Sequence, residues 1–185
     1  MFQGQKGQTL VEVMTVMFVL AVGIMGALGL TSANVKNEHK NLTRLIASNL
    51  AREGVELARS LRDSNWLKGD LWDTGVGSDS EGCALVKDSF SSFEPLDCST
   101  FGELRSDTYR VYKDSNGMYL QNKNGPQVGN TQTTFYRKIN FEPVCDAVPC
   151  SWALKVGIRV ISEVGWADKG DFRTLKAIED LYNWR

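Results

Sequence analysis

An unbroken apolar run near the start of the chain limits its folding more than any other feature. Val13 to Leu30 comprise 18 residues, of which only Thr15 is clearly polar. Spanning a bilayer takes roughly 17–25 such residues, whereas the core of a secretory signal has about 7–15. A helix that is apolar on every side also does not suit the partly exposed surface of a soluble domain. The run therefore predicts a membrane-spanning helix.

A single carboxylate, Glu12, lies at the start of this run. A charge in a membrane helix costs roughly 2.5–3.5 kcal/mol at the helix centre and less near the end, so a residue of this kind usually has a partner or a function. Residues 1–7 carry one basic side chain, Lys6. A short basic flank before a membrane helix tends to stay in the cytoplasm.

The residues Gly7-Gln8-Thr9-Leu10-Val11-Glu12, followed by the apolar run, resemble the class III signal of type IV pilins and pseudopilins. The resemblance implies that a prepilin peptidase cuts between Gly7 and Gln8 and removes residues 1–7 as a leader. It also implies N-methylation of Gln8, and a role in assembly for Glu12 as the partner of a neighbouring subunit's methylated amine. The residue after the cut is most often Phe in this family, and here it is Gln8.

Two other interpretations of this segment stay open. A secretory signal would be cleaved after Thr31-Ser32-Ala33, so that the mature chain would begin at Asn34. A plain membrane anchor would be retained whole, and it needs neither Gly7 nor Glu12. The pilin-like interpretation is favoured because it accounts for both residues and for the length of the run.

The helical pattern continues beyond Leu30 but becomes amphipathic. Apolar residues recur mostly at spacings of three and four, which indicates a helix with one apolar face; they are Leu42, Leu45, Ile46, Leu50, Val55, Leu57, Ala58 and Leu61. No proline precedes Pro95, so nothing forces a break. We predict one helix from Thr9 to Arg62, ended by Asp63-Ser64-Asn65. Gly54 is expected to weaken it by about 1 kcal/mol relative to Ala.

This helix divides into two predicted parts, and a head follows it. Residues 8–30 would lie in the membrane and later in a filament core, and residues 31–63 would pack beneath the head. The head is predicted over residues 64–185, which makes the fold class α+β. Residues 64–107 are expected to be a variable and mostly irregular loop region. Its acids Asp70, Asp73, Asp79 and Glu81 are either a calcium site or a solvated acidic loop.

Residues 108–185 are predicted to form an antiparallel sheet of about four strands. A hairpin is expected around Ser115-Asn116-Gly117, followed by a strand at 134–141. The longest strand, 152–166, would place Leu154, Val156, Ile158 and Val160 on one face. Residues 172–181 have apolar spacing that suits either a helix or a strand. The strand is chosen because the segment follows a turn in a meander.

The four cysteines, Cys83, Cys98, Cys145 and Cys150, all lie beyond the apolar run. An even count in an exported domain favours disulfides. Three pairings are possible, and proximity along the chain favours Cys83–Cys98 with Cys145–Cys150. The spacing lacks the C-x2-C pairs of a zinc site, so no metal is predicted.

The sequence shows no arrangement of catalytic residues. The only histidine, His39, falls on the polar face of the helix, which leaves no partner for a Ser-His-Asp triad. No glycine-rich phosphate-binding motif occurs. The net charge is −1 with no basic stripe, so no direct nucleic-acid contact is predicted. We expect neither an enzyme nor a cofactor-binding protein.

The resemblance implies a structural subunit, a minor pilin or pilin-like protein, of a type IV pilus-type filament. Its expected partners are other pilin-like subunits in a homo- or hetero-polymer, the prepilin peptidase, an inner-membrane assembly platform and membrane lipid. It would be a single-pass membrane protein with its head outside the cytoplasm, and then part of an extracellular or periplasmic filament. The alternatives are a type II secretion pseudopilin, or a membrane-anchored extracellular binding domain that never polymerises.

Overall fold

The computed structural model describes residues 6–75, 83–88, 92–96, 103–122, 125–168 and 170–183; for residues 6–9, 83–88 and 92–96 it describes the backbone alone. One long helix and seven strands form this part, which confirms the α+β class and gives more strands than the four predicted. The elements are α1 (Lys6–Lys68), β1 (Cys83–Asp88), β2 (Ser92–Leu96), β3 (Arg110–Lys113), β4 (Tyr119–Gln121), β5 (Thr131–Val144), β6 (Gly157–Asp168) and β7 (Asp171–Tyr182), with short 3-10 turns at Asp107–Tyr109 and Trp152–Leu154.

The chain divides into two compact units, Met1–Thr43 and Arg44–Arg185, and the second is called the head unit below. In the first unit, every described side chain from Leu10 to Leu42 is exposed. The most apolar part of this helix has a mean hydropathy of 2.4 and none of it is buried. By length and composition, α1 is therefore able to cross a membrane.

The predicted end of the helix at Asp63-Ser64-Asn65 is wrong, because α1 continues to Lys68. Residues of these types often end helices, since their side chains compete for backbone hydrogen bonds. Here the Ser64 hydroxyl donates to the Ser60 carbonyl one turn back, which leaves the helix intact. The helix ends instead at Gly69, whose φ is +79°. Asp70 N–H donates to Asn65 O and Gly69 N–H to Trp66 O, which is the Schellman pattern of a glycine-terminated helix.

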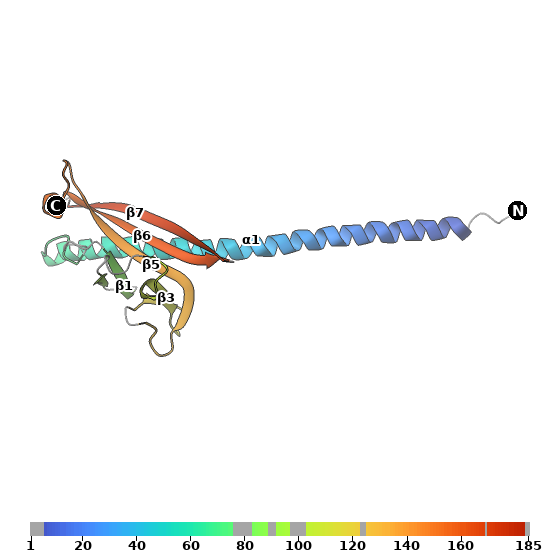
Figure 1. Ribbon diagram of the computed structural model, residues 1–185, viewed down its shortest axis with the longest axis horizontal. Helices are drawn as coiled ribbons and strands as arrows, with labels where there is room; N and C mark the ends of the chain where they lie inside the picture. Colours follow the sequence, from blue (N-terminus) through green and yellow to red (C-terminus); the bar gives the residue numbers. More distant parts are fainter. Residues whose placement is uncertain are drawn as a thin grey trace. The chain divides into compact units, whose positions relative to one another are not determined.

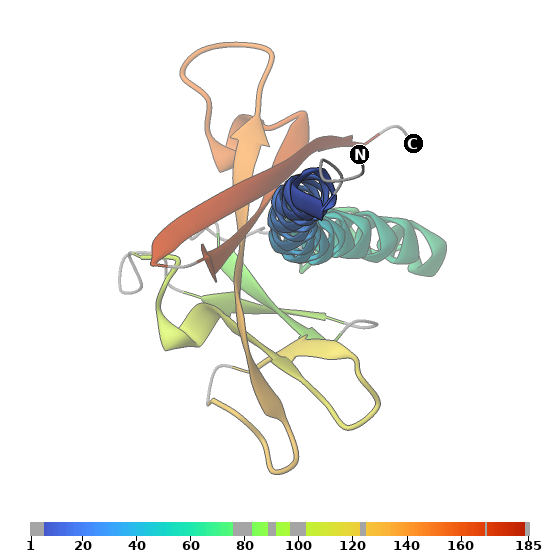
Figure 2. The ribbon, with the colours of Figure 1, turned by 90° about the vertical axis from the view of Figure 1, so that its right-hand side faces the viewer.

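The sheet of the head unit is antiparallel and is organised around β5. One edge of β5 pairs with β6, which pairs in turn with β7. The other edge pairs with β3 near the start of β5 and with β1 further along, and β4 and β2 extend these two branches. Figures 1 and 2 show β5 running through both parts of the sheet. The predicted hairpin, the strand at 134–141 and the strand at 172–181 are confirmed as β3–β4, β5 and β7.

The core lies between the second half of α1 and one face of this sheet. It has two clusters along the helix. The first joins α1 to the start of β5 and the end of β6, and consists of Ala47, Leu50, Ala51, Val111, Phe135, Val164 and Trp166. The second lies further along α1 and consists of Val55, Leu57, Ala58, Ile139, Phe141, Ile158, Val160 and Leu181. Burying each large side chain contributes roughly 1.5–3 kcal/mol, so these contacts hold the helix to the sheet.

Gly54 was expected only to weaken the helix, but it is where the helix and the sheet approach most closely. A methyl group built on Gly54 would lie 2.5 Å from Ile139 Cδ1 and 2.5 Å from Ser162 Oγ. Both distances are well inside van der Waals contact. The missing side chain at Gly54 therefore lets α1 lie against β5 and β6.

Two further predictions need correction. The region 64–107 was expected to be mostly irregular, but it contains β1 and β2, which pair with each other and attach to β5. The strand predicted from Trp152 begins only at Gly157, after a 3-10 turn. Leu154 and Val156 are consequently exposed, whereas Ile158 and Val160 are buried as predicted. The shared face of these four residues requires an extended backbone, which the first two lack.

Candidate functional site: the N-terminal helix and its contacts with the head

The structure places Gly7, Gln8 and Glu12 within the first two turns of α1. For Gly7 and Gln8 it describes the helical backbone alone. The Glu12 side chain is exposed, and Thr15 Oγ1 donates to the Glu12 backbone carbonyl at 2.8 Å. None of the ion pairs in the described part of the chain involves Glu12. The carboxylate is therefore accessible to a cation from another molecule.

Beneath the head, α1 is joined to the sheet by a buried polar network. The side chain of Arg137, on β5, is completely buried, and its Nη1 lies 2.7 Å from Glu53 Oε2 on α1. Arg137 Nε donates to Gln121 Oε1 at 3.0 Å. Gln121 Nε2 in turn donates to the carbonyls of Tyr109 and Arg137. Burial lowers the pKa of Arg137, and the negative charge of Glu53 opposes that effect.

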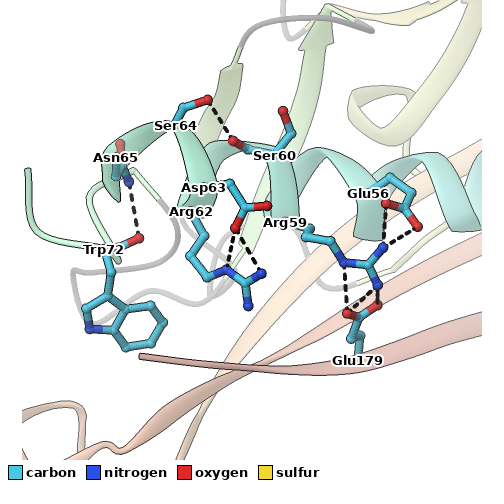
Figure 3. Close-up of polar contacts among 9 residues, drawn as sticks. All are labelled: Glu56, Arg59, Ser60, Arg62, Asp63, Ser64, Asn65, Trp72 and Glu179. Atoms are coloured by element: carbon cyan, nitrogen blue, oxygen red, sulfur yellow. Dashed lines mark hydrogen bonds and ion pairs between the residues drawn. The ribbon is translucent and has the colours of Figure 1, made fainter. Parts of the chain in front are cut away.

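A second ion pair between helix and sheet lies further along α1. Arg59 donates to both carboxylate oxygens of Glu179 on β7, with 2.6 Å between Nη2 and Oε2, and also pairs with Glu56 one turn back (Figure 3). The pKa of Arg59 is raised, chiefly by its hydrogen bond to Glu179. Because these groups are partly exposed, the pairs contribute modestly to stability. With Arg137–Glu53 they set the position of α1 along the sheet.

The segment after the helix is fastened to the head by side chains. Asn65 Nδ2 donates to the carbonyl of Trp72 (Figure 3) and to the carbonyl of Thr74. Asp73 Oδ2 lies 2.6 Å from Lys155 Nζ. Asp73 thus has a cation partner, while Asp79 and Glu81 lie outside the described residues. Within the described residues, no three His, Cys, Asp or Glu side chains gather as metal ligands would.

The predicted Cys145–Cys150 disulfide is confirmed, with an S–S distance of 2.09 Å and a Cα–Cα distance of 5.4 Å. It closes the loop that leads from β5 towards β6. The prediction for Cys83 and Cys98 cannot be compared in the same way, because Cys98 lies outside the described residues and the side chain of Cys83 is not described. His39 is exposed, as predicted.

Comparison with known proteins identifies the N-terminal segment. Residues 3–28 match the family model of the prokaryotic N-terminal methylation motif. This motif is the class III signal of type IV pilin-like proteins, and its presence at residues 3–28 indicates a precursor of the pilin-like or pseudopilin type. Proteins of this class are structural, and the motif with its apolar helix fits a membrane-anchored precursor. No curated protein and no solved structure gives a significant match to the chain.

The buried network is the part of this arrangement that sequence reasoning missed. A signal for it was present: Arg137 lies two residues after Phe135 and two before Ile139, so strand alternation places it on the buried face. A buried arginine in turn requires a carboxylate partner. The sequence alone does not identify Glu53 as that partner, because the contact joins residues 84 positions apart.

Proposed function

We propose that this protein is a structural subunit, a minor pilin or pilin-like protein, of a type IV pilus-type filament. The observation that carries the proposal is the methylation motif at residues 3–28, joined to a helix whose apolar side chains are exposed from Leu10 to Leu30. An exposed apolar helix of this length needs lipid or other helices around it. Lipid would surround it before assembly, and the helices of other subunits would surround it in the filament.

Processing of the precursor would occur between Gly7 and Gln8. The prepilin peptidase would remove residues 1–7 on the cytoplasmic side and leave the amine of Gln8 to be methylated. The remaining chain would stay in the membrane through residues 8–30. Its head would lie outside the cytoplasm, where the Cys145–Cys150 disulfide is stable. The assembly platform of the inner membrane and other pilin-like subunits would then be its partners.

Glu12 would direct the stagger between subunits. Its carboxylate is exposed near the start of an apolar helix, and a charge moved into an apolar environment is costly unless it is paired. The methylated amine of Gln8 from a neighbouring subunit would supply the cation for this pair. Pairing the two would recover much of the desolvation cost only when the helices are correctly aligned.

The first experiment is to determine the N-terminus of the mature protein from its native cell by intact mass and terminal sequencing. An N-methylated Gln8 supports the proposed processing. A terminus at Asn34 would mean secretory cleavage after Ala33, and would remove both the anchor and Glu12 from the mature chain. An intact Met1 would leave a simple membrane anchor. Sheared surface fibres that contain the subunit would then distinguish a filament protein from a binding domain that stays in the membrane.

The variant Glu12→Ala tests the role of the carboxylate. It should insert in the membrane and fold its head normally, yet enter sheared fibres several-fold less than the wild type. Glu38→Ala is the matched control, because Glu38 is an exposed acid on the same helix but outside the apolar run. Normal incorporation of Glu12→Ala would contradict the pairing.

A further inference from the structure

The turn that joins β3 to β4 contains a chemically reactive pair of residues, Asn116 and Gly117. In an Asn-Gly sequence the backbone nitrogen of the glycine is able to attack the asparagine side chain, because glycine has no side chain of its own to obstruct the approach. Both residues are exposed, so the water that completes the reaction has access to them. The turn therefore meets the chemical requirements for deamidation.

The reaction changes only bonds of these two residues. The backbone nitrogen of Gly117 gives up its proton and attacks Cγ of Asn116. A bond forms between these two atoms, the bond from Cγ to Nδ2 breaks, and Nδ2 leaves as ammonia with the proton that Gly117 gave up. The product is a succinimide ring. Water then opens the ring at either of its carbonyl carbons, and residue 116 becomes aspartate or isoaspartate.

In the closed turn, a third residue holds both reacting groups. The N–H of Gly117 donates to the backbone carbonyl of Asp114 at 3.1 Å. The leaving amide is also bonded to Asp114, because Asn116 Nδ2 donates to Asp114 Oδ2 at 3.4 Å. The attack requires that Gly117 gives up the proton of the first bond and that the Asn116 side chain turns away from the second. Both hydrogen bonds must therefore break first.

The Asp114 carboxylate also closes the backbone of the turn. Its Oδ1 accepts from the N–H of Asn116 at 2.9 Å and from the N–H of Met118 at 2.7 Å. The N–H of Asp114 donates in turn to the Met118 carbonyl at 2.9 Å. Hydrogen bonds to an ionised acceptor are stronger than those between neutral groups. The carboxylate therefore contributes a large part of the stability of the closed turn.

We propose that Asn116 is a deamidation site and that Asp114 controls its rate. While the turn is closed, the reacting groups are held and Asn116 is stable. When the turn opens, Gly117 is free to attack. Asp114 forms no bond to the reacting atoms during the reaction, so it is a positioning residue.

Deamidation would prevent the same turn from closing again. The product replaces the donor Nδ2 by a carboxylate oxygen, which would face the carboxylate of Asp114, and like charges repel. Isoaspartate also adds a carbon atom to the backbone before Gly117, which displaces the N–H groups that follow. The pairing of Lys113 with Tyr119 lies next to the turn. The reaction would thus loosen the β3–β4 hairpin irreversibly.

The experiment follows deamidation of the full chain in detergent micelles at mildly alkaline pH, with the chain unfolded in guanidinium as the reference. Trypsin cuts after Lys113 and Lys123, so Asn116 is recovered on the peptide 114–123, and tandem mass spectrometry locates the modified residue. The pair Asn124-Gly125 falls on the next peptide. Because both asparagines precede glycine, they should react at similar rates in the unfolded chain, which makes Asn124 the internal reference.

In the folded chain, Asn116 should react at least about tenfold more slowly than in the unfolded chain, which corresponds to one hydrogen bond to a charged group. Equal rates at Asn116 in the two states would overturn the proposal. The same holds if Asn116 does not react in an unfolded chain whose Asn124 does.

Three variants test the role of Asp114 in the folded chain. Asp114→Ala should raise the rate at Asn116 at least about tenfold, because it removes the bonds to a charged acceptor. Asp114→Asn keeps an acceptor oxygen for the backbone N–H groups and should recover part of the protection. Ser115→Ala, at an exposed residue of the same turn, should leave the rate unchanged. A wild-type rate in Asp114→Ala would refute control by Asp114.

A fourth variant separates opening of the turn from unfolding of the whole head. Replacing Cys145 and Cys150 by Ser destabilises the head through a different loop and should leave the rate at Asn116 unchanged. If this variant accelerates the reaction as much as Asp114→Ala does, unfolding of the head controls the reaction and the assignment to Asp114 fails. None of these readouts depends on processing of the N-terminus or on assembly.

Discussion

The buried pair of Arg137 and Glu53 should respond unequally when one partner is removed. The Arg137 side chain is fully buried and the Glu53 side chain is 29% exposed. If Glu53 loses its charge, Arg137 has no route to water and stays buried without a counter-charge. If Arg137 is replaced by an apolar residue, Glu53 is able to turn towards solvent. The two substitutions therefore remove the same pair but leave different residues behind.

The expected magnitudes follow from this asymmetry. Glu53→Gln should destabilise the head by roughly 3 kcal/mol, the lower end of the range for breaking a buried pair, because the amide still accepts a hydrogen bond. Arg137→Met fills a similar volume and removes the hydrogen bond that Arg137 Nε donates to Gln121 Oε1, a loss of about 1–2 kcal/mol. Glu56→Gln is the control, since its carboxylate is 61% exposed and exposed pairs contribute about 1 kcal/mol or less.

The assay is unfolding in urea of residues 31–185, which lack the apolar run. Unfolding is monitored by the fluorescence of tryptophans such as the buried Trp166. Free energies from midpoints and slopes would rank Glu53→Gln as most destabilising, then Arg137→Met, then Glu56→Gln. Equal losses for the first two, or a larger loss for Arg137→Met, would refute the argument that solvent access of the remaining partner sets the cost.

Three other features are tested by substitutions in the same assay. Gly54→Ala should destabilise the head, because overpacking costs about 1–3 kcal/mol whereas the higher helix propensity of Ala contributes at most about 1 kcal/mol. Adding Ile139→Val, which deletes the nearest methyl group, should restore part of the lost stability. Replacing Cys145 and Cys150 by Ser should cost about 2 kcal/mol from the closed-loop entropy, and an unchanged midpoint would argue against it. Because Arg159 lowers the pKa of Asp180, stability from this pair is present above the unfolded pKa near 4 and is lost as pH falls through the folded value; Asp180→Asn should therefore flatten the acid limb of the stability profile.

Features encoded by neighbouring residues were predictable from the sequence. The helix follows from periodicity, the β3–β4 hairpin from its Ser115-Asn116-Gly117 turn, and the Cys145–Cys150 bond from a separation of five residues. The strand β7 was correctly preferred over a helix because of its place after a turn. In each case the deciding interaction is local or follows directly from the order of the elements.

Features decided by distant residues were not predictable. The residue types at Asp63 to Asn65 predict a helix end. The Asn65 side chain instead donates to carbonyls of the turn that follows, and the helix continues past these residues. From the sequence alone, Gly54 predicts only a weaker helix, because its role depends on the packing of β5 and β6 against it. The roles of Gly7, Gln8 and Glu12 depend on a peptidase and on neighbouring subunits, so they stay predictions of the motif. Determining the N-terminus of the mature protein tests the predicted processing.

Because the apolar side chains of the first part of α1 are exposed, water does not suit this part of the protein, and lipid does not suit the head. Fourteen large apolar side chains between Leu10 and Leu30 are exposed, and removing each from water is favourable by roughly 1.5–3 kcal/mol. Their sum exceeds the roughly 5–15 kcal/mol that holds a domain folded. In a membrane-anchored precursor, a head that unfolds would therefore stay tethered to the bilayer by this helix. To leave the bilayer, the apolar part of α1 would need another apolar surface that replaces the lipid around it throughout the process.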